Sequence, residues 1–297
     1  MARDLLFGIG ECMVEMSPAD EDRYRLGFAG DTFNTCWYLH RELPQAQVAF
    51  LSAVGRDRMS DRMLAFMREG GVDTSHIARL PDATVGLYLV ELDRAERSFA
   101  YWRSDSAARR LASDPRHLTA SLARAKLAYF SGITMAILPP KGRRALLAAL
   151  KKARADGCIV AFDPNLRPAL WSDAHEMRAE ITRAAETADI ILPSYDDEKT
   201  GFGDATPLDT VARYAKLGAP VVVLKNGASR VYARARGVDH QMAVPFAERV
   251  VDTTAAGDSF NAGFLAAHLL GRDVLSAMSA GARLSGRVIG SRGALVN

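Results

Sequence analysis

The nine residues DTTAAGDSF (252–260) place two carboxylates, three hydroxyl groups and a glycine directly before a helix-forming segment, NAGFLAAHLL. Ala255, Ala256 and Gly257 are small, so a phosphate could closely approach their backbone N–H groups at a helix N-terminus. Asp258 in the first turn is favoured by the helix dipole as a simple charge. Beside a bound phosphate it could also accept a proton from an attacking hydroxyl group. The dipole explains the acid but not the small residues before it.

A second polar group stands at the start of another expected helix, FAGDTFNTCWYLHREL (28–43). Asp31 is well placed to be the N-cap of this helix, which would give it a structural role. Gly30, Asp31 and Asn34 also lie together at the helix start, where a sugar with many hydroxyl groups could meet backbone and amide groups. The spacing alone leaves both interpretations open.

Two arginines end other expected elements. Arg103 closes the strand-like segment SFAYWR, and Arg167 lies in FDPNLRP (162–168), directly after an apolar run. An isolated arginine is usually a solvated surface charge. Arg167 differs because ligands of parallel sheets bind at the carboxyl ends of the strands. Two arginines from separate elements could together bind a carboxylate or a phosphate.

Two glycine motifs follow apolar strands. In GIGE (8–11) the pair Gly8-x-Gly10 lacks the third glycine that opens a helix in a dinucleotide-binding fingerprint, and the following CMVEM has a strand pattern. A nicotinamide site is therefore disfavoured there. In KNG (225–227), Gly227 is either a turn residue or a point where the backbone approaches a nucleotide.

The elements that must position these residues alternate along the chain. Apolar runs that predict buried strands are LLFGIG (5–10), AFLSAV (49–54), LAYFSG (127–132), IVAFD (159–163), IILPS (190–194) and VVVLK (221–225). Segments with helical spacing, such as RRALLAALKKARADG and TPLDTVARYAKLG, lie between several of them. The alternation predicts a mostly parallel sheet covered by helices on both faces.

Four further strands have no helices between them. ECMVEM (11–16) and RYRLGF (23–28) flank the turn SPADED, and TVGLYLVELDRAERSFAYWR (84–103) predicts two strands around an Asp-Arg-Ala-Glu turn. We expect them to form a small separate sheet that acts as a lid. The chain would then be a single domain, 1–297, with a β lid at about 11–29 and 84–104.

Composition excludes several classes of protein. The 297 residues are 48% apolar with a net charge of +3, and the basic residues alternate with acidic ones, so neither nucleic acid nor a membrane is an expected partner. No run approaches the roughly 18 apolar residues that span a bilayer, and the N-terminus has no cleavage signal. Three scattered cysteines argue against zinc and disulfides. We expect a cytoplasmic protein.

The motifs together resemble those of the ribokinase-like (PfkB) carbohydrate kinases. GIGE, the GD..N helix start, VG.D (54–57), the two-part lid, FDPNLRP, KNG and DTTAAGDSF occur in the order of that family over nearly the whole chain. Within the family the chain looks most like the 2-keto-3-deoxygluconate kinase branch, by AGDTFNT, GLYLVELD, SFAYWRSDSAA, SGITMAIL, NLRPALW and DTTAAGDS. Fructokinases more often have a GGAPAN-like stretch in place of AGDTFN and lack YWR.

The resemblance implies a role for each candidate residue. Asp258 would be the general base that takes the proton of the substrate's 6-hydroxyl group, beside an anion hole formed by Ala255, Ala256 and Gly257. The remaining substrate contacts would be Gly30, Asp31 and Asn34 at the sugar hydroxyls, Tyr88 and Tyr101 on the lid side, and Arg103 and Arg167 at a carboxylate. The remaining ATP contacts would be Asn165, Arg167, Ser194, Lys225 and Gly227, with the helix near 277–289 beside the adenine.

The resemblance also implies Mg²⁺ as a partner of ATP and not as an ion caged by protein ligands. The magnesium-associated N-x-x-E motif of the family appears here as Ser194-Tyr-Asp-Asp197. Asp197 is therefore the expected acid, or Glu198 if the register differs by one residue. Ala29 stands where many relatives have the first glycine of GGD, and Ala255 replaces a glycine that is common in the wider family.

The expected activity is ATP-dependent phosphorylation of 2-keto-3-deoxy-D-gluconate at the 6-hydroxyl to 2-keto-3-deoxy-6-phosphogluconate. The alternatives are a fructokinase or another PfkB sugar kinase and, from another class, a non-catalytic sugar or nucleotide sensor. A sensor is expected to lack the base or the anion hole, and both are present here. Apolar and aromatic residues on the lid predict at least a homodimer through the lid sheets.

Overall fold

The computed structural model describes residues 4–20, 23–93 and 96–296. Nine strands form a large sheet in the order β13-β12-β11-β10-β9-β8-β1-β4-β5. Neighbours from β5 to β11 are parallel, and β12 and β13 add antiparallel at one edge. The strands are β1 (Leu5–Ile9), β4 (Gln47–Val54), β5 (Ile77–Arg79), β8 (Ala125–Ser131), β9 (Ile159–Asp163), β10 (Ile190–Ile191), β11 (Val221–Asn226), β12 (Arg230–Ala235) and β13 (Val238–Ala243).

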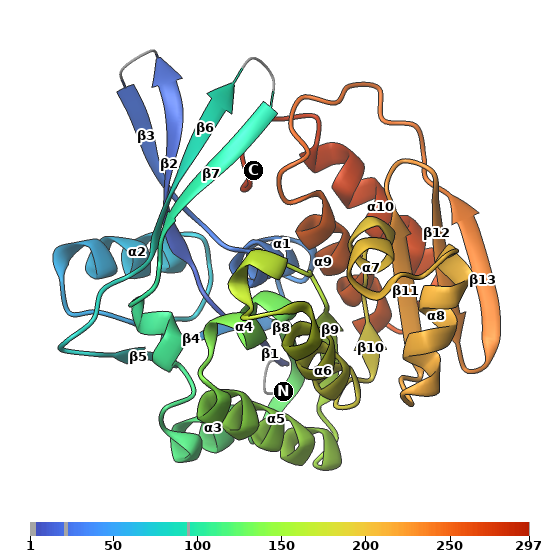
Figure 1. The fold of residues 1–297 in the computed structure, drawn as a ribbon, viewed down its shortest axis with the longest axis horizontal. Coiled ribbons are helices and arrows are strands. Elements are labelled where there is room, and N and C mark those ends of the chain that lie inside the picture. Colours follow the sequence, from blue (N-terminus) through green and yellow to red (C-terminus); the bar gives the residue numbers. More distant parts are fainter. Residues whose placement is uncertain (1–3, 21–22, 94–95, 297) are drawn as a thin grey trace.

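Helices cover both faces of this sheet (Figure 1). They are α1 (Asp31–Glu42), α2 (Arg58–Glu69), α3 (Pro115–Leu122), α4 (Gly132–Ile137), α5 (Pro140–Ala155), α6 (Ala174–Ala185), α7 (Tyr195–Phe202), α8 (Pro207–Lys216), α9 (Ala256–Leu269) and α10 (Val274–Val288), with short 3-10 turns η1 (Ala107–Arg110) and η2 (Pro168–Leu170). The two faces bury separate cores because side chains alternate along each strand. Leu6 and Phe50 pack with α1, α2, α9 and α10, whereas Phe7 and Leu51 pack with α3, α5 and α6.

The second sheet has four strands in the order β3-β2-β6-β7 and projects away from the helical layers (Figure 1). Its strands are β2 (Met13–Asp20), β3 (Arg23–Ala29), β6 (Leu87–Asp93) and β7 (Glu96–Trp102). β2 pairs antiparallel with β3 and parallel with β6, and β6 pairs antiparallel with β7. The predicted fold class, a large mostly parallel sheet between helices with a small β-sheet beside it, is confirmed.

Some predicted boundaries are wrong. Most of the expected turn SPADED is strand, because β2 continues to Asp20 and pairs with β3 through a register shift after Pro18. The rest of that turn, 21–22, and the centre of the Asp-Arg-Ala-Glu turn, 94–95, lie outside the described residues. In IILPS only Ile190–Ile191 is a strand, and Ser194 forms an isolated bridge with Lys225.

Candidate active site

A cleft of about 940 Å³ collects residues from both sheets at the carboxyl ends of the parallel strands. All of the predicted site residues except Gly227 line it: Gly30, Asp31, Asn34, Tyr88, Tyr101, Arg103, Asn165, Arg167, Ser194, Lys225, Ala255, Ala256, Gly257 and Asp258. Asp197 lines it as well. Residues more than 200 positions apart therefore meet in one cavity, as expected for ligands of an open α/β sheet.

The N-terminus of helix α9 faces this cleft and has no capping side chain. Its cap is Ala255, whose φ of 59° lies in the left-handed region and whose side chain offers no acceptor to the first N–H groups. A Cβ added at Gly257 would lie 3.7 Å from Lys225 Nζ, the nearest atom within 4 Å among the described residues. Packing does not require glycine there, and the absence of a side chain leaves open the space between the first turn and Lys225, where an anion could meet the helix N-terminus.

Asp258 lies in the first turn of α9, where its Oδ2 accepts a hydrogen bond from Asn34 Nδ2 at 2.8 Å. Burial raises the pKa of Asp258 to about 7, with further contributions from the negative charges of Asp31 and Asp163. The hydrogen bond from Asn34 and the charge of Lys225 lower the pKa and oppose the shift only in part. A carboxylate with a pKa near neutrality is suited to accept a proton from a hydroxyl group.

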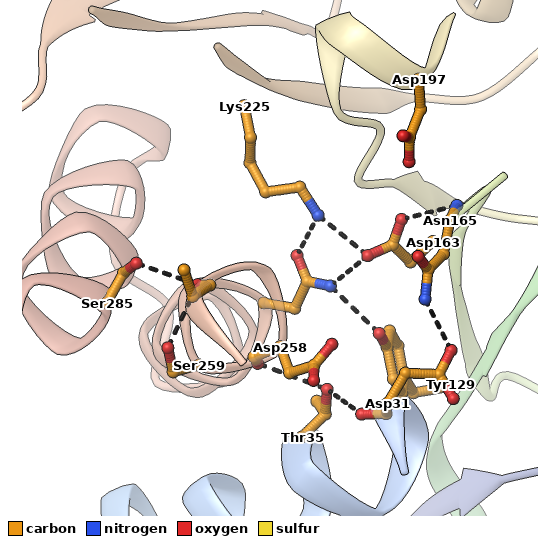
Figure 2. Close-up of polar contacts among 12 residues, drawn as sticks. Asp31, Thr35, Tyr129, Asp163, Asn165, Asp197, Lys225, Asp258, Ser259 and Ser285 are labelled. Carbon is orange, nitrogen blue, oxygen red and sulfur yellow. Dashed lines mark hydrogen bonds and ion pairs between the residues drawn. The ribbon is translucent and has the colours of Figure 1, made fainter. Parts of the chain in front are cut away.

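Lys225 is held at the cleft by a buried polar network (Figure 2). Its Nζ donates to Asp163 Oδ2 at 2.8 Å and to Asn261 Oδ1 at 3.0 Å. Asn261 Nδ2 in turn donates to Asp163 Oδ2 at 2.6 Å and to the Tyr129 hydroxyl oxygen at 3.0 Å. The ammonium group is thereby fixed between two acceptors, close to the first turn of α9.

The sequence analysis did not identify Asp163, Asn261 and Tyr129 as site residues. Asp163 carried a usable signal, because it ends the apolar run IVAFD at the strand edge where ligands bind. Asn261 and Tyr129 are buried at 0% exposure, and no local pattern distinguishes them from core positions. Glu11 also lines the cleft and was not predicted to be a site residue, although it ends GIGE after the first strand.

Asp31 was expected to be the N-cap of α1, but the structure gives that position to Gly30. The helix begins at Asp31 and its cap is Gly30, where an added Cβ would lie only 2.1 Å from the carbonyl oxygen of Glu11. The Asp31 side chain is instead used across the cleft, where Oδ2 accepts from Asn165 Nδ2 at 2.8 Å (Figure 2). Asn165 has a φ of 35°, a backbone region that asparagine tolerates better than most residues.

The two arginines both line the cleft, and each is already paired with an acid. Arg103 Nη2 donates to Glu11, and its side chain is 9% exposed. Arg167 Nη1 donates to its neighbour's carbonyl at 2.6 Å and lies 3.4 Å from Asp197 Oδ2, with its side chain 49% exposed. Arg167 therefore has the greater freedom to meet a ligand.

The aromatic side of the cleft comes from the small sheet. Tyr88 is buried and its hydroxyl group donates to Glu15. Burial raises the pKa of Tyr88, and the neighbouring Glu15 adds to the shift. Tyr101 is 52% exposed, and its ring centroid lies 5.9 Å from that of Tyr88 and 6.2 Å from that of Phe99. These rings give the cleft an apolar wall.

Glu198 does not line the cleft, so the alternative register for the magnesium-associated acid is wrong. Its carboxylate is fully buried, accepts from Arg213 Nη2 at 2.7 Å and from the Tyr214 hydroxyl group at 3.0 Å, and serves the packing of α7 on α8. Asp197 faces the cleft. The described residues contain no cluster of three or more His, Cys, Asp or Glu that could cage a metal ion.

A second cavity of about 600 Å³ adjoins the first and shares Ser194, Lys225 and Gly257 with it. Gly227, with a φ of 53°, lines this cavity. Apolar and small residues make up much of the rest, including Ala228, Val231, Val244, Pro245, Phe246, Phe260, Ala282, Gly286 and Ile289. The segment at the end of α10 that was expected to flank adenine thus borders a cavity suited to a flat apolar base.

No helix among the described residues has the length and apolar character needed to cross a membrane.

Comparison with known proteins gives consistent matches over the full length. The model for the pfkB family carbohydrate kinases matches residues 4–297. The chain is 38% identical over 296 residues to the 2-dehydro-3-deoxygluconokinase of Escherichia coli strain K12, covering 97% of this chain and 96% of the relative. It is 39% identical to that of Dickeya dadantii strain 3937, with 97% and 95% covered. The crystal structure of a PfkB protein from Polaromonas sp. JS666 superposes with a TM-score of 0.84 at 28% identity, covering 97% and 96%.

Proposed function

The chain belongs to the pfkB family of carbohydrate kinases, and we propose that it phosphorylates 2-keto-3-deoxygluconate at the 6-hydroxyl group, giving 2-keto-3-deoxy-6-phosphogluconate. The observation that carries the proposal is the content of one cleft. A proton acceptor, Asp258, an uncapped helix N-terminus and the arginines Arg103 and Arg167 all line it. The relatives of 35–39% identity named 2-dehydro-3-deoxygluconokinase support the choice of sugar acid.

The proposed mechanism relies on position and charge, as phosphoryl transfer generally does. ATP with its Mg²⁺ supplies the phosphoryl group. Asp258 takes the proton of the sugar hydroxyl as that oxygen attacks, and the N–H groups at Ala255, Ala256 and Gly257 stabilise the negative charge that develops. Lys225 adds a fixed positive charge beside them, because Asp163 and Asn261 hold its ammonium group.

The remaining contacts divide between the two substrates. Gly30, Asp31 and Asn34 at the start of α1 bind sugar hydroxyl groups, Tyr88 and Tyr101 flank the sugar, and the two arginines bind its carboxylate. Asn165, Ser194 and Gly227 lie toward ATP, with the base in the 600 Å³ cavity. Asp197, which lines the cleft, would hold the Mg²⁺ of ATP directly or through water.

The small sheet, residues 11–29 and 84–104, acts in this proposal as a lid of a single domain that excludes water from the cleft. Trp102 is 59% exposed and Tyr24 is 44% exposed on this sheet, which supports a homodimer that buries them. Light scattering at working concentration should give at least twice the monomer mass, and a monomer would contradict this part. The free, buried cysteines accord with a cytoplasmic location.

The test is a comparison of acceptors. ATP consumption is measured with 2-keto-3-deoxygluconate, gluconate, fructose and ribose at equal concentrations. We expect the highest kcat/KM for 2-keto-3-deoxygluconate. A preference for fructose would show that the substrate is a neutral ketose and not a sugar acid. Sugar binding without formation of ADP from any acceptor would indicate a sensor.

A further inference from the structure

The cleft contains more acidic than basic side chains, and each basic one has an acid partner. Lys225 pairs with Asp163, Arg167 with Asp197 and Arg103 with Glu11. The acids that line the cleft are Glu11, Asp31, Asp163, Asp196, Asp197, Asp252 and Asp258. A substrate that carries a carboxylate therefore enters a region of negative charge in which no arginine is free of an acid. A carboxylate that pairs with one of these arginines therefore changes the electrostatic surroundings of its acid partner.

The pair of Glu11 and Arg103 is the most deeply buried of the three. Their side chains are 1% and 9% exposed, compared with 33% and 49% for Asp197 and Arg167. Glu11 Oε2 accepts from Arg103 Nη2 and Oε1 accepts from the Ser106 hydroxyl group. Buried ion pairs add little to stability compared with apolar packing, so stability is a weak reason for this one.

The guanidinium group of Arg103 retains unused hydrogen-bonding capacity. Its Nε is buried and has no hydrogen-bond partner in the part of the chain that the structure describes. A buried donor without a partner is costly, so the pair with Glu11 leaves the guanidinium group of Arg103 only partly satisfied. Arg103 lines the cleft, where a substrate carboxylate can reach it.

Two glycines, Gly86 and Gly30, lack the side chains that would crowd Glu11. A Cβ at Gly86 would lie 3.0 Å from Glu11 Oε1 and 3.3 Å from Arg103 Cβ. A Cβ at Gly30 would lie 2.1 Å from the carbonyl oxygen of Glu11. Gly86 thus closely approaches the carboxylate of Glu11, and Gly30 closely approaches its backbone.

We propose that Glu11 is a positioning residue for acidic substrates: it holds Arg103 in the free enzyme and takes up a proton from solvent when the substrate carboxylate pairs with that arginine. One proton joins the Glu11 carboxylate on binding, no substrate bond changes, and the proton returns to solvent when the product leaves. A neutral ketose brings no charge and requires no proton. This inference rests on the proposed function, because it requires a sugar acid as the substrate.

The surroundings of Glu11 favour this exchange. Burial raises the pKa of Glu11, and Arg103, Ser106 and Arg109 oppose the shift. The thiol of Cys12 beside it stays neutral, because burial and the charge of Glu11 raise its pKa. When the substrate carboxylate neutralises Arg103, the main opposing charge is offset while burial remains. The pKa of Glu11 then rises further, so binding takes up a proton and weakens as the pH increases.

The test counts protons by titration calorimetry. Asp258 also titrates near neutral pH, so all proteins carry Asp258→Asn, which in addition prevents turnover. Binding of 2-keto-3-deoxygluconate is measured at pH 7 in phosphate and in Tris, which differ in ionisation enthalpy. We expect D258N to show buffer-dependent heat that corresponds to a net uptake of up to one proton, and D258N/E11Q to show none. The matched control D258N/S106A, which keeps the Glu11 charge, should retain the uptake, and fructose should cause none.

Each alternative result has a definite meaning. Equal heats in both buffers for D258N, or uptake that persists in D258N/E11Q, would overturn the role of Glu11 and leave the proposed function intact. Failure of the sugar acid to bind, with fructose binding, would overturn the proposed function and this inference with it. If D258N/E11Q does not fold, the pH dependence of the Kd of D258N for 2-keto-3-deoxygluconate tests the proposal instead. This Kd should rise with pH, by up to about tenfold per unit where the proton is taken up, and a flat profile would contradict the proposal.

Discussion

Asp258 derives its proposed role from opposing influences on one carboxyl group. Burial and the acids Asp31 and Asp163 raise its pKa to about 7, while the Asn34 hydrogen bond and Lys225 keep the shift from going further. The group is therefore partly ionised at neutral pH and basic enough to take a proton. A dipole-stabilised surface acid would have a lowered pKa instead, so the simple helix-dipole explanation covers only a part of what this residue does.

The first prediction concerns Asp258→Asn. The amide keeps the shape and can still hydrogen-bond to Asn34, but it cannot accept the hydroxyl proton. We expect kcat to fall by about 10² to 10⁴, with ATP affinity changed little, as measured by an ADP-coupled assay and by calorimetry with ATP. Turnover near that of the wild type would exclude Asp258 as the base.

The second prediction concerns pH. The ionised form of Asp258 is the active one and its pKa in the free protein is about 7, so kcat should rise as the pH increases from 6 toward 8, and its profile should have an inflection. Asn34→Ala removes the hydrogen bond that lowers this pKa, so its inflection should move to higher pH. Profiles of kcat at saturating substrate measure both. An unchanged inflection in the Asn34 variant would show that another group controls the profile.

Among the elements, the N-terminus of α9 is the proposed anion site. The left-handed cap at Ala255 turns the chain sharply into the helix without a capping side chain, and the first two helical residues, Ala256 and Gly257, are small. The third prediction is that Gly257→Ala lowers kcat/KM for ATP by about 10², because its Cβ would project toward Lys225 Nζ into the anion space. Thermal stability should be unchanged or slightly higher, since alanine favours helix.

A matched control for this change lies in the first turn of α5. Gly142→Ala adds the same methyl group away from both cavities, where its nearest neighbour would be Leu138 Cδ2 at 3.3 Å. It should leave kcat/KM unaffected. Equal losses in the two variants would mean that the effect of Gly257→Ala comes from packing and not from the phosphate site.

Local patterns in the sequence predicted most of the elements, because apolar periodicity is visible within a few positions; the anion site, predicted from small residues before an acid, stays a prediction. The same patterns failed for Asp31, where the close approach of Gly30 to Glu11 moves the cap by one residue. They also missed the Lys225 network, whose partners Asp163 and Asn261 are 62 and 36 positions away. Contacts of that kind depend on the topology of the sheet and leave no local signature.

At the scale of the whole molecule, two sheets share one cleft. The large sheet brings the ends of β1, β9 and β11 together, which places Glu11, Asp163 and Lys225 at one edge. The small sheet contributes the aromatic wall and Arg103. The small sheet supplies residues proposed for sugar recognition and none proposed for phosphoryl transfer, so changes in it should alter substrate preference without loss of the transfer chemistry.

Selection of the sugar by its carboxylate is the core of the proposed function. The most direct measurement is kcat/KM for 2-keto-3-deoxygluconate and for fructose in the wild type and in Arg167→Ala, a change at a half-exposed side chain that the fold does not require. Loss of a charged hydrogen bond should lower kcat/KM for the sugar acid by roughly 10- to 100-fold and leave the value for fructose nearly unchanged. Equal losses for both sugars, or a wild-type preference for fructose, would contradict the account.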